Sequence, residues 1–261
     1  MTNQTIERAA RKLRLSGLLD SLDVRFQESV ANNLTHAEFL ELILQDELMV
    51  RDQRAFERRK KNARFRELRT LEDFDFRFNE SIKRSQIYEL ATCNYIKETR
   101  DVLFMGPPGV GKSHLAQALG YQAVKNGYTV LYTSIFDLVR DLAEEEEELP
   151  GKRSRLNKYL KCELLIVDDM GIKQLPGRSG EHLFEIVMRR HEVRSTIMTS
   201  NRPLEEWGKL IGDVPAATAI LDRFLQHAEI IQITGKSYRV KDRISGTKKK
   251  EETGESKPAT K

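Results

Sequence analysis

This 261-residue chain lacks the segments that would place a protein in or across a membrane. No apolar run approaches the roughly 18 residues that a membrane-spanning helix needs, so we expect no membrane partner. Residues 1–8 also lack the apolar core of a signal peptide, which predicts a cytoplasmic protein. The two cysteines, Cys93 and Cys162, fit no zinc-ligand spacing. Because a reducing compartment disfavours a disulfide, we expect both thiols to be small core side chains.

Helix breakers are scarce in residues 1–65, which contain no proline and a single glycine, Gly17. Leucines recur in this stretch at helical spacing. Thr35 is a good N-cap, and Glu38 follows it by three residues, as in a capping box. No breaker follows before about residue 64, so the helix that begins there should be very long. Residues 1–65 are therefore predicted to form an all-α N-terminal domain that binds DNA or a protein partner.

Basic residues cluster near the end of that predicted helix, although the net charge of the whole chain is only +4. Residues 51–69 hold nine basic and three acidic side chains. Positions 51, 54, 58 and 61 would share one helix face, which suits the phosphate backbone of duplex DNA. A solvated charged helix is the alternative interpretation. The residues predicted to bind DNA are Arg51, Arg54, Arg58, Arg59, Lys60, Lys61 and Arg64.

The pattern changes after residue 65. In residues 66–80, Phe74, Phe76 and Phe78 alternate with charged residues, which predicts an extended connector with its rings anchored on a neighbouring surface. From 81 to 244, apolar strands alternate with helical patterns, which predicts an α/β domain built on a five-stranded parallel sheet. The predicted strands are 102–105, 129–133, 164–167, 196–199 and 229–233. Residues 245–261 contain almost nothing apolar and predict a disordered basic tail.

The segment Gly106–Ser113 fits the phosphate-loop pattern G-x-x-x-x-G-K-[ST] completely, between a predicted strand and a predicted helix. Its glycines let the backbone wrap around phosphates, and the helix N-terminus adds partial positive charge. We expect Lys112 to reach the β- and γ-phosphates of ATP and Ser113 to bind Mg²⁺. A chance Gly/Pro turn is the alternative. The predicted nucleotide-binding residues are Gly106, Pro107, Pro108, Gly109, Val110, Gly111, Lys112, Ser113 and His114.

Two further strands end in polar residues. The apolar run 164–167 leads into Asp168 and Asp169, which suits a Walker B site. We expect Asp168 to hold Mg²⁺ through water and Asp169 to orient or deprotonate the attacking water. Asn201 follows the strand 196–199 and is a candidate sensor of the γ-phosphate or the attacking water. The alternatives are an acidic turn in the first case and an ordinary Asn-containing turn in the second.

Two arginines near the end of the α/β region are candidates for transition-state stabilisation. Arg223 lies in a helical run, and Arg239 follows the last strand. An arginine supplied by a neighbouring subunit can neutralise charge that develops on the phosphates. A solvated or ion-paired surface arginine is the alternative for each. The acidic run 144–148 has three open interpretations: a solvated helix end, a face that repels DNA, or a partner for Lys152, Arg153 and Arg155 of a neighbour.

These motifs together resemble an AAA+ ATPase of the DnaA/DnaC-like group. Residues 103–116, 165–171 and 199–203 look most like the IstB family, the ATPase helpers of insertion-sequence transposases. Residues 13–20, 39–47 and 58–65 resemble the helical domain of that family, so the likeness covers nearly the whole chain except the tail. It implies Arg223 as the arginine finger and Arg239 as the second sensor arginine. Asp169 departs from the glutamate that many AAA+ proteins carry, and its shorter side chain predicts modest turnover.

The resemblance implies an ATP-driven homo-oligomer that assembles on duplex DNA and delivers that site to a transposase. A DnaC-like helicase loader, with the same core and a different client, is the nearest alternative. A metabolic P-loop kinase is a more distant one. The absence of a second substrate motif, together with Asn201 and Arg223, argues against the kinase.

Overall fold

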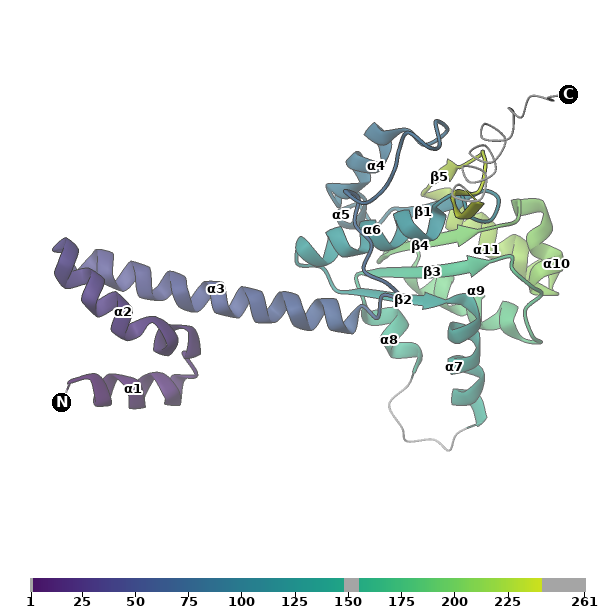
Figure 1. Ribbon diagram of the computed structural model, residues 1–261. Coiled ribbons are helices and arrows are strands. Elements are labelled where there is room, and N and C mark those ends of the chain that lie inside the picture. The colour runs from purple at the N-terminus through teal and green to yellow at the C-terminus, as the bar shows by residue number, and fades with distance from the viewer. Residues whose placement is uncertain (1, 148–154, 241–261) are drawn as a thin grey trace, which may run out of the picture. The chain divides into compact units, whose positions relative to one another are not determined.

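The computed structural model describes residues 2–147 and 155–240, and it divides into two compact units at Lys61/Asn62 (Figure 1). The predicted tail 245–261, Glu148, Lys152 and Arg153 lie outside the described residues. The first unit contains three helices, α1 (Thr2–Leu13), α2 (Ser16–Asn32) and α3 (His36–Asn62). None of the helices in the described part of the chain is both long and apolar enough to cross a membrane.

Polar contacts between α2 and α3 organise the first unit. Glu47 of α3 is buried, and its carboxylate accepts hydrogen bonds from the backbone N–H groups of Gly17 (2.7 Å) and Leu18 (3.1 Å) at the start of α2. These bonds satisfy donors that a helix N-terminus leaves unpaired. Gly17 is required because a Cβ at this position would lie 2.9 Å from the α3 backbone. The predicted capping box is confirmed, since Thr35 and Glu38 bond each other's backbone N–H groups at the start of α3.

The second unit is a five-stranded parallel sheet with the strand order β2-β3-β4-β1-β5. All five predicted strands are present, within one residue at the start of each and up to three at the end. The α/β fold class is therefore confirmed. The strands are β1 (Asp101–Met105), β2 (Val130–Ser134), β3 (Leu164–Met170), β4 (Ser195–Ser200) and β5 (Ala228–Gln232).

Helices cover both faces of this sheet, as its apolar strands require (Figure 1). On one face, α6 packs so closely on β3 that a Cβ at Gly120 would lie 2.5 Å from the Ile166 side chain. The core of the other face joins strand residues to the helices from α7 to α11, with Trp207 and Phe224 fully buried. The helices are α4 (Arg84–Ala91), α5 (Asn94–Lys97), α6 (Lys112–Lys125), α7 (Ile135–Glu147), α8 (Leu156–Lys161), α9 (Ser179–Arg190), α10 (Trp207–Ile211) and α11 (Val214–Gln226), with 3-10 turns η1 (Leu204–Glu206) and η2 (Tyr238–Val240).

The predicted connector belongs to the second unit and is not extended. Its backbone folds into successive turns, with N–H groups of Phe74, Phe76 and Phe78 bonded to carbonyls two or three residues earlier. The prediction of an extended segment was wrong because Thr70 and Asp75 bond nearby backbone N–H groups and stabilise turns instead. The expectation that the rings are anchored is confirmed: Phe74 packs edge-on against His114, Phe78 does so against Tyr238, and Phe76 lies beside Tyr88 of α4.

Both cysteines are buried and free, as predicted. The described part of the acidic run continues α7, and Glu144 forms an ion pair with Arg155 of the same chain. The Glu145 carboxylate also accepts a bond from the backbone N–H of Leu156 at the start of α8. Within the described residues, these contacts tie the end of α7 to α8 of the same subunit.

Candidate functional site

The loop 106–113, called the phosphate loop from here on, connects β1 to α6 at the carboxyl edge of the sheet. Gly106 (φ 152°) and Gly111 (φ 106°) have backbone conformations that favour glycine. A Cβ would lie 2.0 Å from the carbonyl oxygen of Ile233 at position 106, and 2.7 Å from the Phe74 ring at position 111. The loop is therefore enclosed by the residue that follows β5 and by the connector.

Lys112, the first residue of α6, is held across the phosphate loop. Its ammonium group donates hydrogen bonds to the carbonyl oxygens of Gly106 (2.7 Å) and Pro107 (2.8 Å). The side chain is only 5% exposed, and this burial lowers the pKa of its ammonium group to about 8. A partly desolvated cation at a helix N-terminus is a strong attractor of anions such as phosphate.

Asp168 lies at the end of β3, and three hydroxyl groups from different elements donate to it. Ser113 Oγ of α6 lies 2.8 Å from Asp168 Oδ1, while Tyr132 of β2 bonds Oδ2 and Thr199 of β4 bonds Oδ1. Asp168 is only 1% exposed, so its carboxylate has a fixed orientation. A serine hydroxyl beside a carboxylate supplies the hard oxygen ligands that Mg²⁺ prefers. Sequence reasoning missed Tyr132 and Thr199, although both lie near the carboxyl ends of parallel strands.

Asp169 adopts a left-handed backbone conformation (φ 69°) at an irregularity in the pairing of β3 with β4. Its backbone N–H donates to Thr199 Oγ1 (3.1 Å). One carboxylate oxygen lies 3.7 Å from the guanidinium of Arg66. Burial and the neighbouring Asp168 raise the pKa of Asp169, and the positive charge of Arg66 opposes that shift. In the sequence Arg66 falls within the basic cluster 51–69, and no motif near it connects it with this site.

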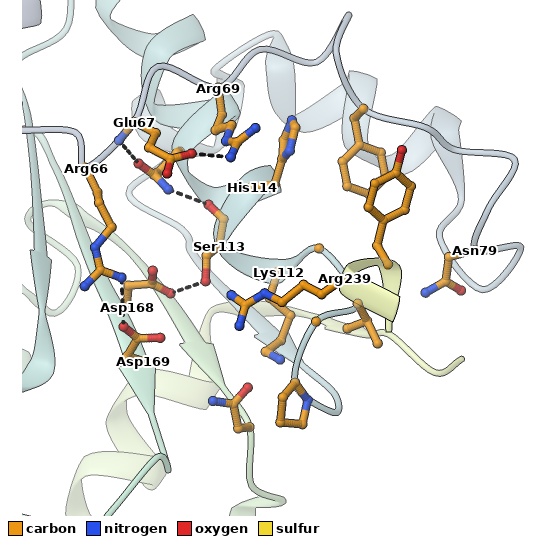
Figure 2. Close-up of a pocket in the computed structure, with 18 of the residues that line it drawn as sticks. Arg66, Glu67, Arg69, Asn79, Lys112, Ser113, His114, Asp168, Asp169 and Arg239 are labelled. Carbon is orange, nitrogen blue, oxygen red and sulfur yellow. Dashed lines mark hydrogen bonds and ion pairs between the residues drawn. The ribbon is translucent and has the colours of Figure 1, made fainter. Parts of the chain in front are cut away.

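These groups line one cavity of about 950 Å³ (Figure 2). Asp168, Asp169 and Arg66 lie on one side of it, and Lys112 and Arg239 lie near its centre. Asn201 also lines the cavity, and its backbone N–H is bonded to the carbonyl of Met170 (2.9 Å). The fold thus collects residues of the phosphate loop, β2, β3, η2 and the connector at one edge of the sheet.

Not every predicted site residue lines this cavity. Gly106 and Pro107 contribute the carbonyl groups that hold Lys112 instead. His114 lines the cavity, and its ring nitrogen lies 2.9 Å from the carbonyl oxygen of Thr70 in the connector. Arg223 is exposed on α11 and does not line the cavity, so within one subunit it is not part of the site.

The predicted DNA-binding residues differ in how they are held. Arg51 forms an ion pair with Glu47 (2.6 Å), and Arg54 bonds the hydroxyl of Ser16, so both support the packing of the first unit. Lys60 pairs with Glu57 of the same helix (3.3 Å). The remaining residues of the set include Arg58 and Lys61, which are exposed. Within this set, the basic side chains near the end of α3 are thus the most available for contact with a polyanion.

Residues 8–246 match the family profile described as IstB-like ATP binding protein. The chain belongs to the IstB-like family. It is 33% identical to an ATP-binding protein of insertion sequence IS5376 from Geobacillus stearothermophilus, over 95% of this chain and 99% of that one. It is 37% identical to an ATP-binding protein of insertion sequence IS21 from Pseudomonas aeruginosa, over 89% of this chain and 87% of that one.

Solved structures agree with this membership. The crystal structure of the DnaC helicase loader is similar with a TM-score of 0.51 and 25% identity, covering 59% of this chain and 91% of that one. AMPPCP-bound DnaA from Aquifex aeolicus shares the fold with a TM-score of 0.53 and 24% identity, covering 74% of this chain and 58% of that one. This IstB-like protein is therefore an ATP-binding AAA+ ATPase, and the kinase alternative is not supported.

Proposed function

We propose that this protein assembles on duplex DNA in an ATP-dependent manner and delivers the bound site to a transposase. The observation that carries the proposal is the match along nearly the full length of both chains to an insertion-sequence ATP-binding protein. A match of that extent includes the helical first unit as well as the ATPase core, and the helical unit is where we expect DNA or partner contacts.

We assign the cavity to ATP, with the triphosphate on the phosphate loop. Lys112 would exchange its two carbonyl partners for the β- and γ-phosphates, which are stronger acceptors for an ammonium group. Asp169 would orient or deprotonate the attacking water, and Asn201 would contact that water or the γ-phosphate. Arg239 lines the same cavity and would contact the phosphates from η2.

The donor set at Asp168 fits Mg²⁺. Ser113 Oγ and the Asp168 carboxylate are adjacent oxygen ligands at the phosphate end of the cavity. No group of three or more His, Cys, Asp or Glu side chains that could hold a metal occurs in the described part of the chain. A small number of protein ligands is enough for Mg²⁺, because the ion is usually held by one or two side chains together with water and substrate phosphates. The ion would neutralise phosphate charge during hydrolysis.

The position of Arg223 supports a homo-oligomer. It is exposed on α11 and does not line the cavity of its own subunit, so it would act only on the nucleotide of a neighbour. An arginine supplied in trans couples hydrolysis to assembly, because the site is incomplete until the next subunit is in place. ATP would then control when the oligomer forms on DNA and when it dissociates.

A DnaC-like helicase loader remains the second candidate, because the ATPase core has the fold of the DnaC helicase loader. That similarity covers 59% of this chain, whereas the similarity to the insertion-sequence protein covers 95%. The wider match favours the transposition role. The two candidates differ in the client: a transposase for one and a replicative helicase for the other.

The proposal is tested by light scattering and electron microscopy of the protein with ATP, Mg²⁺ and duplex DNA. We expect large particles only when nucleotide and DNA are both present. The Lys112→Ala variant should remain small, because it cannot bind the triphosphate. Particles that form equally well without ATP would contradict the proposal. Pull-down with an insertion-sequence transposase, compared with pull-down with a replicative helicase, separates the two clients.

A further inference from the structure

Asn79 is a buried polar side chain with an unused hydrogen-bond donor. It is 5% exposed, and its amide nitrogen has no hydrogen-bond partner among the residues that the structure describes. An unpaired buried donor lowers stability, so such a group is unusual unless a ligand uses it. The residue lines the cavity that also contains Lys112 and Asp168.

The rest of the Asn79 side chain is firmly held. Its amide oxygen accepts bonds from the Ser81 hydroxyl (2.8 Å) and the Ser81 backbone N–H (3.3 Å). Ser81 in turn exchanges bonds with the backbone of Thr234, just after β5. The Asn79 amide also packs against Gly235, where a Cβ would lie 3.1 to 3.3 Å from its atoms. The oxygen therefore has a structural role, and the nitrogen has none.

Asn79 lies at the end of the cavity opposite Asp168 and Asp169, with Lys112 and Arg239 between them (Figure 2). Aromatic side chains line this end. The rings of Phe78 and Tyr238 meet edge to face with their centroids 4.9 Å apart, and the Tyr238 backbone N–H bonds the Gly109 carbonyl (2.9 Å). Apolar ring surface beside a lone amide donor is the environment that a flat heterocyclic base requires.

We propose that Asn79 is the residue that selects the base of the nucleotide, with its amide nitrogen donating to N1 of adenine. The inference rests on the proposed placement of the triphosphate on the phosphate loop, because that placement leaves this end of the cavity for the base. The aromatic pair at Phe78 and Tyr238 opens to admit the base beside Asn79. Binding of the base then gives the Asn79 amide nitrogen a hydrogen-bond acceptor.

The amide nitrogen of Asn79 discriminates between adenine and guanine through the chemistry of position 1 of the purine ring. Adenine presents a bare ring nitrogen there, which accepts a hydrogen bond. Guanine presents an N–H, so two donors would face each other and neither would be paired. A site that leaves a buried polar group unpaired rejects the wrong ligand strongly. ATP should therefore bind more tightly than GTP, and the difference should depend on residue 79.

The experiment compares the affinities of the full-length wild-type protein and the Asn79→Asp variant for ATP and GTP, measured by displacement of a fluorescent nucleotide with Mg²⁺ present. Aspartate keeps the oxygen that accepts from Ser81 and replaces the unpaired donor by an acceptor. We expect the ratio of ATP to GTP affinity to fall by roughly tenfold or more. Asn94→Asp is the matched control, because it makes the same chemical change at an exposed position on α5 outside the cavity.

Further measurements keep the result decisive. Asn79→Ala should weaken ATP binding by about three- to tenfold without a gain for GTP, and thermal melting reports whether either variant is folded. In the wild-type protein, 7-deaza-ATP should bind like ATP, because N1 is unchanged. An unchanged ATP to GTP ratio in folded Asn79→Asp overturns the inference, and so does a loss of 7-deaza-ATP binding. If Lys112→Ala abolishes ATP binding in the same assay, the placement of the triphosphate stands independently.

Discussion

The guanidinium of Arg66 lies 3.7 Å from the carboxylate of Asp169, so the first residues after the helical unit reach the acid at the end of β3. The connector is fixed there by two further bonds, from the Glu67 backbone N–H to Gln117 (3.2 Å) and between His114 and the Thr70 carbonyl (2.9 Å). Figure 2 shows Arg66 approaching Asp169 from this connector. The site thus includes a positive charge that is independent of the phosphate loop.

We predict that Arg66→Ala lowers the turnover number for ATP by about two- to fivefold and leaves KM unchanged. The loss should be modest because the Arg66 side chain is 69% exposed, and solvent screens such a pair strongly. Arg69→Ala is the control, since Arg69 lines the same cavity but pairs with Glu67. Steady-state ATPase assays measure the turnover of both variants. An equal loss of turnover in Arg66→Ala and Arg69→Ala would attribute the effect to the positive charge of the cavity as a whole and not to the pair with Asp169.

A second prediction concerns the metal. EDTA should abolish ATP hydrolysis, and Mg²⁺ should restore it. Asp168→Asn should lower turnover on the order of a hundredfold or more while nucleotide binding persists, because the ion loses its anionic ligand. Tyr132→Phe removes one donor to the same carboxylate without changing the ligands, so its effect should be much smaller. Similar losses in the two variants would show that Asp168 acts through its hydrogen bonds and not through Mg²⁺.

The parts of this structure that sequence reasoning predicted are those with local causes. The capping box at Thr35 and Glu38 depends on residues three positions apart, and the strands follow from short apolar runs. The phosphate loop is recognisable because its backbone needs glycine at defined positions. Each of these features is encoded by a few neighbouring residues.

The parts that sequence reasoning missed depend on contacts between distant residues. Arg66 reaches Asp169 across 103 positions, and nothing near either residue indicates that pair. Residues 66–80 form turns although an extended segment is predicted, because phenylalanines that alternate with charged residues have the same pattern as a strand. No local sequence signal marks Asn79, since its unpaired amide nitrogen is visible only when Ser81 and Gly235 are placed around it.

A third prediction concerns the basic end of α3. Arg58→Glu combined with Lys61→Glu should weaken binding to duplex DNA of any sequence. The slope of log affinity against log salt concentration should also fall by about two, since each lost phosphate contact removes about 0.9. Lys97→Glu with Lys209→Glu is the charge-matched control on exposed residues of the second unit. Equal weakening by both pairs, measured by fluorescence anisotropy, would attribute binding to net charge alone.

The last prediction separates an arginine that acts in trans from one that acts within its own subunit. Arg223→Ala alone and Lys112→Ala alone should each lose most DNA-stimulated ATPase activity. A mixture of the two should recover part of it, because a subunit with intact Lys112 can meet a neighbour with intact Arg223. Arg239 lines the cavity of its own subunit, so mixing Arg239→Ala with Lys112→Ala should recover nothing. If the Arg223→Ala mixture also stays inactive while both proteins still assemble, Arg223 does not complete a neighbour's site.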